Sequence, residues 1–148
     1  KGFDTMRIMA IDYGDAHTGV AISDATGLLA GYTTTIHSRK PETAVQEIAR
    51  LVQERQVEEV VLGFPKNMDG SESLRAPLYR QFAALLEEAL GKPPVLWDER
   101  RTTIDAHRIL FDAGKNGKKR KKTVDAVAAS LILEGYLTFR RTQKDPIP

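Results

Sequence analysis

The chain contains no cysteine, which excludes both a disulfide framework and a thiolate metal site. It also lacks any apolar run approaching the roughly 20 residues that span a bilayer, and no signal-peptide pattern opens it. Aromatic residues are few, at 7%, while 41% of the residues are hydrophobic. These features are typical of an ordinary globular protein, and we expect a cytoplasmic location with no membrane partner.

The length of 148 residues favours one domain with a substantial core. We expect this domain to cover residues 6–140, because Met6 directly precedes the first apolar segment and is a plausible native start. Residues 1–5 are then an expression remnant or a short N-terminal extension, and residues 141–148 a polar tail.

The net charge of +2 is unevenly distributed. Six positive charges lie within one short run, so the rest of the chain carries a net charge of −4. The run comprises Lys115, Lys118, Lys119, Arg120, Lys121 and Lys122. Such a basic loop is either simply solvated or an attachment site for a polyanion.

The hydrophobic pattern predicts three closely spaced strands and then alternating helices and strands. We expect strands over residues 7–12, 19–23, 28–36, 58–64 and 93–100. Helices are expected from Pro41, from Ser71 as N-cap, over residues 102–114, and from Thr123 as N-cap. The order β-β-β-α-β-α-β-α predicts an α/β fold, a mixed five-stranded sheet with helices on both faces. In such sheets, functional groups gather at the carboxyl ends of the parallel strands.

Acidic residues from distant positions of the sequence are predicted to lie at this edge of the sheet. Asp12 ends the first strand, Asp98 and Glu99 end the last strand, and Asp125 lies in the first turn of the final helix. Carboxylates that converge repel each other unless they share protons or bind cations, and all-oxygen ligands favour Mg²⁺ or Mn²⁺. Two such ions support phosphodiester hydrolysis.

Each acid also has an ordinary structural explanation. Asp12 could be a turn residue, and Asp125 could simply favour the positive end of the helix dipole. Asp98 and Glu99 are adjacent and must point to opposite faces of a strand, so only one of them can join the cluster directly. Spacing alone does not decide which.

Several basic and polar residues lie near the same predicted edge. Lys66 and Asn67, in "PKNMDGS", could hold a phosphate beside a helix N-terminus, although this segment also reads as a plain turn. Arg100 or Arg101 could contact a phosphate through its planar guanidinium group. The basic run precedes Asp125, so Lys118, Lys119, Arg120, Lys121 and Lys122 are candidates for salt-dependent nucleic-acid binding.

Four segments resemble the YqgF/RuvX family in the order in which that family has them, from Met6 to about Leu137. They are "AIDYGDAHTGVAISD", "VVLGFPKNMDGSES", "DERRTTIDAHRIL" and "KKTVDAVAASLIL". The family is described as pre-16S rRNA nucleases or homologues of Holliday junction resolvases. The resemblance implies a ribonuclease H-like sheet and a metal-dependent nuclease, with Asp12, Glu99 and Asp125 as catalytic metal ligands. It therefore favours Glu99 over Asp98.

The chain departs from this family at His17, where the family usually has arginine. Histidine can change its charge near neutral pH, whereas arginine cannot. If this position contacts a phosphate, the contact should weaken as the pH rises. A surface histidine without a role in the site is the alternative.

The sequence leaves more than one function open. The leading interpretation is a nuclease that matures the 5′ end of pre-16S rRNA, as a monomer or weak dimer. A resolvase of branched DNA would use the same acids, but would favour a dimer for symmetric cleavage. A non-catalytic RNA-binding assembly factor would need only the basic run. An actin-like phosphate-binding protein would need a second lobe, for which the chain is too short.

Overall fold

The computed structural model describes residues 6–24, 26, 30–98 and 117–144, and the side chains of these residues except 117–124 and 142–144. Five strands and three helices are defined there. Their bounds are β1 Ile8–Asp12, β2 His17–Ser23, β3 Ala30–His37, α1 Pro41–Glu54, β4 Glu59–Phe64, α2 Ala76–Leu90, β5 Val95–Asp98 and α4 Gly117–Lys144.

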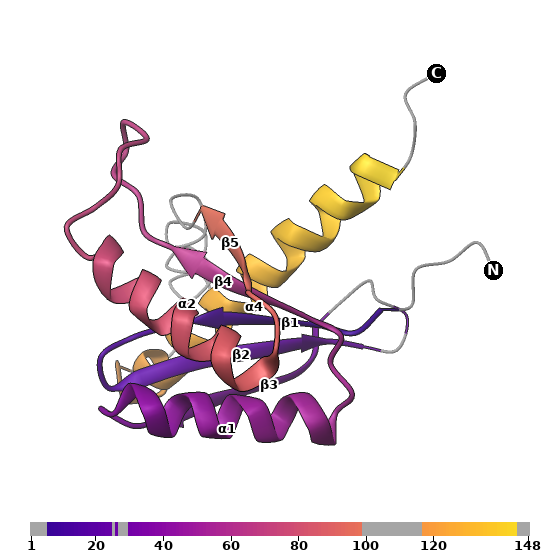
Figure 1. Cartoon of the computed structure of the whole chain (residues 1–148), viewed down its shortest axis with the longest axis horizontal. Helices are drawn as coiled ribbons and strands as arrows, with labels where there is room; N and C mark the ends of the chain where they lie inside the picture. The colour runs from indigo at the N-terminus through magenta and orange to yellow at the C-terminus, as the bar shows by residue number, and fades with distance from the viewer. Residues whose placement is uncertain (1–5, 25, 27–29, 99–116, 145–148) are drawn as a thin grey trace.

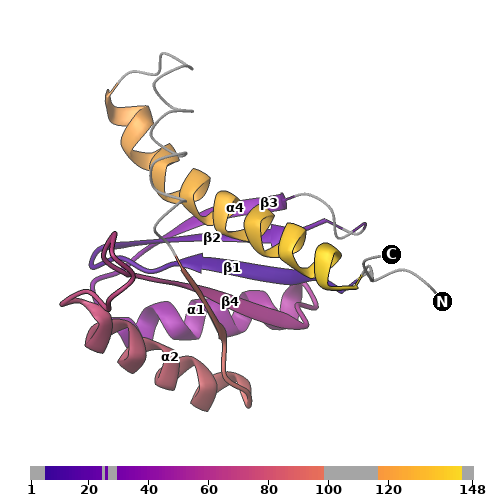
Figure 2. The same cartoon turned by 90° about the horizontal axis from the view of Figure 1, so that it is seen from above.

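The strands form one sheet in the order β3-β2-β1-β4-β5 (Figure 1). β2 pairs antiparallel with both β1 and β3, whereas β4 pairs parallel with β1 and β5. Helices α1 and α2 cover one face of this sheet, and α4 crosses the other (Figure 2). The prediction of a mixed five-stranded α/β sheet is confirmed.

The two faces of β1 build two separate parts of the core. Met9 and Ile11 pack towards α1 and α2, whereas Ile8 and Ala10 pack against α4. This division follows from the alternation of side chains along a strand. All four residues are essentially inaccessible to solvent, so β1 is fixed on both sides. Its last residue is therefore held in a defined position.

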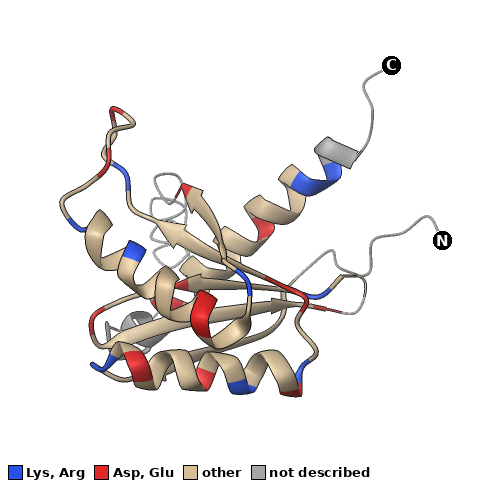
Figure 3. Cartoon of the chain, viewed as in Figure 1, with Lys and Arg blue, Asp and Glu red and all other residues tan. Residues whose placement is uncertain are grey.

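The outer surface of α1 carries charges of both signs (Figure 3). Arg50 bridges Glu47 at 2.6 Å and Glu54 at 2.8 Å, with all three side chains exposed. Exposed pairs at this spacing add little to stability, because water and salt screen the charges. This face of the molecule is consequently a solvated surface without an excess of positive charge.

The start predicted for α2 is wrong. Ser71 does not cap the helix, which begins at Ala76 with Arg75 as its N-cap residue. Instead, the Asp69 carboxylate accepts hydrogen bonds from the backbone N–H of Ser71 (2.9 Å) and from its hydroxyl (2.6 Å). Local side-chain bonds of this kind compete with helix formation, and they hold Ser71 in a turn.

The prediction of a loop for the basic run is also wrong for residues 117–122. Helix α4 begins at Gly117, ahead of the N-cap expected at Thr123. Lysine and arginine are good helix formers, and no proline or glycine interrupts residues 118–122. The helix predicted over residues 102–114 lies outside the described residues. In the part of the chain that is described, no helix is long and apolar enough to cross a membrane.

Candidate active site at the carboxyl edge of the sheet

Asp12 is the last residue of β1, at the edge where the parallel strands β4 and β5 also end. Since Ile8 and Ala10 face α4, the alternation of the strand places Asp12 on that same face. Its partner in the register of β2 is Gly19. The carboxylate therefore lies at the boundary between the sheet edge and α4.

Asp125 lies directly over this position. A β-carbon added at Gly19 would overlap the carbonyl oxygen of Asp125 and lie 2.7 Å from its carbonyl carbon. Only glycine permits so close an approach of a helix backbone to a strand. Because Gly19 pairs with Asp12, the structure brings together the backbones of two of the three predicted acids, which are 113 positions apart in the sequence.

The structure describes Asp98, the neighbour of the third predicted acid, and places it on the other face of the sheet. Val95 and Trp97 pack on the α4 side of β5, whereas Asp98 pairs with Phe64, which packs against α2. Asp98 is thus on the opposite face from Asp12. Glu99 and Arg100 lie outside the described residues, as does Arg101. Within the described residues, no group of three histidine or acidic side chains could hold a metal ion.

The loop after Asp12 is fastened to α2 by aromatic contacts. The Tyr13 ring stacks on Phe82, with centroids 4.0 Å apart, and the Tyr79 hydroxyl donates a hydrogen bond to the Tyr13 carbonyl at 2.9 Å. Burial, reinforced by the negative charge of Asp15, raises the pKa of Tyr13 and keeps its hydroxyl neutral. These contacts fix the backbone immediately beyond the carboxylate.

An ion pair adds a second attachment for this loop. Arg75, at the start of α2, contacts the Asp15 carboxylate at 3.0 Å, and this hydrogen bond raises the pKa of Arg75. Both side chains are largely exposed, so the pair contributes about 0–1 kcal/mol. The buried aromatic contacts, rather than this ion pair, are expected to carry most of the positional restraint.

We expect Tyr79→Phe to destabilise the protein by about 0.5–1.5 kcal/mol, because it removes the hydrogen bond to the Tyr13 carbonyl and keeps the ring. Urea denaturation followed by circular dichroism measures this change. The matched control is Asp15→Ala, which removes the ion pair and leaves Arg75 and both tyrosines in place, and it should cost less than Tyr79→Phe. A larger loss for Asp15→Ala would show that the ion pair is the principal attachment.

The "PKNMDGS" segment is a small hairpin rather than a helix start. The backbones of Lys66 and Glu72 form an isolated antiparallel β-bridge. The Asn67 side-chain amide donates to the Ser71 hydroxyl at 3.0 Å and to the Glu72 carbonyl at 3.3 Å. Asn67 therefore supports the turn, and the Lys66 residue is exposed. Their predicted role in phosphate binding stays a prediction.

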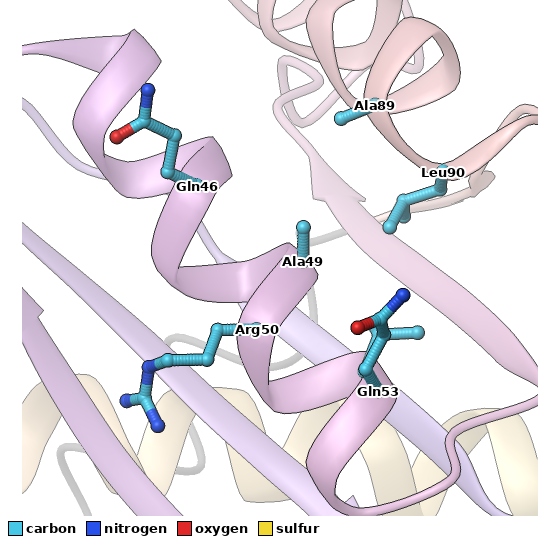
Figure 4. A pocket seen from close by; sticks show the side chains of 7 residues that line it. Gln46, Ala49, Arg50, Gln53, Ala89 and Leu90 are labelled. Atoms are coloured by element: carbon cyan, nitrogen blue, oxygen red, sulfur yellow. The ribbon is translucent and has the colours of Figure 1, made fainter.

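A shallow pocket between α1 and the end of α2 lies on the opposite face of the sheet from α4 (Figure 4). It is lined by Gln46, Ala49, Arg50, Val52, Gln53, Ala89 and Leu90. It contains no acidic side chain that could bind a metal. The edge carrying Asp12 and Asp125 is therefore the better candidate site.

Sheet order and helix placement together define a ribonuclease H-like α/β domain. The chain superposes on Thermus thermophilus RuvC, solved in complex with a Holliday junction substrate, with a TM-score of 0.60 at 12% identity, covering 96% of this chain and 99% of that one. The fowlpox virus resolvase gives a TM-score of 0.54 at 9% identity, covering 95% and 100%. At such low identity, these likenesses establish the fold.

The chain belongs to the RuvX family, whose model, described as "Holliday junction resolvase", matches residues 6–139. A relative from Halothermothrix orenii is 46% identical over 91% of this chain and 96% of its own length. A relative from Carboxydothermus hydrogenoformans is 40% identical over 91% and 98%. Both carry the name "Putative pre-16S rRNA nuclease". The family resemblance inferred from the sequence is confirmed.

Sequence reasoning did not identify Gly19 and Tyr79 as parts of this site. A glycine inside an otherwise apolar strand can indicate the close approach of another backbone, so Gly19 could have been found from its context in "TGVAIS". Tyr79 gave no comparable signal, because an aromatic residue on a helix is usually a core residue.

Proposed function

We propose that this protein is a metal-dependent nuclease that hydrolyses phosphodiester bonds in structured nucleic acid, with precursor 16S rRNA as its substrate. The observation that carries the proposal is the contact between Gly19 and the Asp125 backbone, beside Asp12. The names of the relatives supply the substrate. A precursor-rRNA substrate would place the protein in the cytoplasm.

The donor chemistry of this edge fits a hard divalent cation. Asp12 and Asp125 supply carboxylate oxygens, and the chain has no cysteine to compete with them. We assign Glu99 as the third ligand, since Asp98 is on the wrong face of β5. Mg²⁺ or Mn²⁺ held there would activate water and stabilise the charge that develops on the phosphate.

The protein's own part in this reaction is positioning. The core on both faces of β1 fixes the position of Asp12. The close approach at Gly19 sets the distance between α4 and the sheet. Such preorganisation matters because small displacements of a catalytic group cost large factors in rate. We also propose that three residues bind the phosphodiester backbone on either side of the cleaved bond, namely Lys66, Asn67 and Arg100.

Cleavage of a four-way DNA junction is the second candidate, supported by the description of the family model. One assay tests both functions. Precursor 16S rRNA, a four-way junction and plain single strands are each offered to the protein with Mg²⁺, with Mn²⁺ and with excess EDTA. We expect metal-dependent cleavage of the precursor rRNA. Cleavage that persists in EDTA would contradict the metal mechanism, and preferential junction cleavage would favour the second candidate.

We expect the positively charged N-terminal part of α4 to bind the phosphates of nucleic acid. The N-terminal part of α4 extends beyond the edge of the sheet (Figure 2), and it carries Lys118, Lys119, Arg120, Lys121 and Lys122. We expect replacement of these five residues by glutamine to weaken RNA binding and to flatten the slope of log affinity against log salt concentration. The slope should fall by roughly 0.7 for each phosphate of a single strand that the variant no longer neutralises.

Fluorescence anisotropy at salt concentrations from about 50 to about 200 mM measures this slope. As a matched control, Lys92, after α2, and Arg141, near the C-terminal end of α4, are replaced by glutamine; both are exposed, and the slope should stay the same. An unchanged slope in the variant of the basic run would contradict this role.

A further inference from the structure

His17 and His37 form a pair that the proposed nuclease site does not use. The two residues are opposite each other in the register of β2 and β3, and their rings lie with centroids 4.9 Å apart at an interplanar angle of 88°. We propose that this pair binds a divalent transition-metal ion, such as Ni²⁺, Cu²⁺ or Zn²⁺, through one nitrogen of each imidazole. Water would fill the remaining positions.

The strand register suits chelation. The backbone N–H of Ser38 donates to the Ala16 carbonyl at 3.0 Å, so the hydrogen bond lies beside the histidine pair rather than within it. His17 and His37 are therefore at a non-hydrogen-bonded position, where the α-carbons are about 4.5 Å apart and side chains are closest. The backbone thus holds the two rings in contact, edge to face, before any ion binds.

The spacing of the rings also matches the requirement of a metal ion. At a metal–nitrogen distance of about 2.0–2.1 Å, each ring centroid lies roughly 3.2 Å from the ion, and a tetrahedral angle separates two such centroids by roughly 5 Å. The observed 4.9 Å is close to this separation, so chelation would require rotation of the rings and no change in the spacing of the two strands. Because His37 is exposed and His17 half-buried, the ion can reach the pair from solvent.

The pair is chemically distinct from the carboxylates nearby. Imidazole favours Zn²⁺, Ni²⁺ and Cu²⁺, whereas carboxylates favour Mg²⁺ and Mn²⁺. His17 is two residues from Gly19 and so shares its face of β2, which places the pair beside the candidate active site. The inference depends only on the two histidines, and it stands whether or not the protein cleaves nucleic acid.

Calorimetric titration of the whole chain with Ni²⁺ tests the proposal, together with the broadening of imidazole NMR signals by substoichiometric Cu²⁺. We expect a Ni²⁺-binding step that requires both histidines, and selective broadening of two histidine signals by Cu²⁺. His17→Ala and His37→Ala should each weaken binding at least about tenfold, because even the outer-shell partners of metal ligands are worth about 10–100-fold. His37→Phe should do the same while keeping an aromatic ring at this position.

Two further variants separate this site from others. His107→Ala removes the third histidine of the chain, and Asp12→Asn alters the candidate nuclease site. Both should keep the Ni²⁺ binding that depends on His17 and His37. Full affinity in His17→Ala or His37→Ala would overturn the proposal, and so would loss of binding in Asp12→Asn, because the ion would then belong to the carboxylates.

Discussion

Asp12→Asn is expected to reduce metal-dependent cleavage by about 10²–10³-fold or more, the scale on which single groups that stabilise a transition state contribute. Asparagine keeps the size of the side chain and removes its negative charge, so the cation loses a charged ligand while the fold is retained. The measurement is a single-turnover cleavage rate at saturating Mg²⁺, with the melting temperature recorded alongside.

The matched control is Asp15→Asn. Asp15 is three residues away in the same loop, but it is exposed and pairs with Arg75. Its removal should change the rate little and lower stability by at most about 1 kcal/mol. Equal rates for Asp12→Asn and the unmodified protein would mean that Asp12 is only a turn residue.

Gly19→Ala is expected to have the second large effect. The added methyl group cannot fit, because its carbon would overlap the Asp125 carbonyl, which is backbone and cannot rotate away. α4 would have to move off the sheet, at a cost of about 1–3 kcal/mol or more. Asp125 would move with it, and a shift of about 1 Å in a catalytic group can cost about 10²-fold in rate.

Gly135→Ala is the control for this substitution. Gly135 lies in the same helix, but a β-carbon there would be 3.4 Å from the Trp97 side chain, an ordinary contact. Alanine is the better helix former by about 0.5–1 kcal/mol, so this variant should be as stable as the parent or more so. Thermal unfolding and cleavage rates of both variants decide the question. If Gly19→Ala is stable and active, the position of α4 does not depend on this contact.

The sequence was sufficient to predict the sheet because its strands are clearly marked. β1 is a continuous apolar segment ending in Asp12, and Pro41 opens α1 where the pattern changes to helical spacing. The parallel pairing of β1 with β4 and β5 then places Asp12 at the edge where both of those strands end. Local composition and topology thus predicted the position of Asp12 in the sheet correctly, and its role as a metal ligand stays a prediction.

Other features depend on contacts that local pattern does not encode. Ser71 could cap a helix or close a turn, and the choice depends on the Asp69 carboxylate two residues before it. The start of α4 at Gly117 was not predicted, because a run of like charges is typical of a solvated loop. The lysines and arginine of this run are nevertheless good helix formers. The fastening of Tyr13 by Tyr79 joins residues 66 positions apart, which single-sequence reasoning does not detect.

The most direct test of the account is a crystal structure of the protein grown with Mn²⁺, in which anomalous scattering locates the ion. We expect an ion at the carboxyl edge of the sheet, bound by carboxylate oxygens of Asp12 and Asp125 and by Glu99. A structure in which the manganese binds elsewhere, or contacts only one of these three side chains, would contradict the central claim that the fold assembles these distant acids into one cation site.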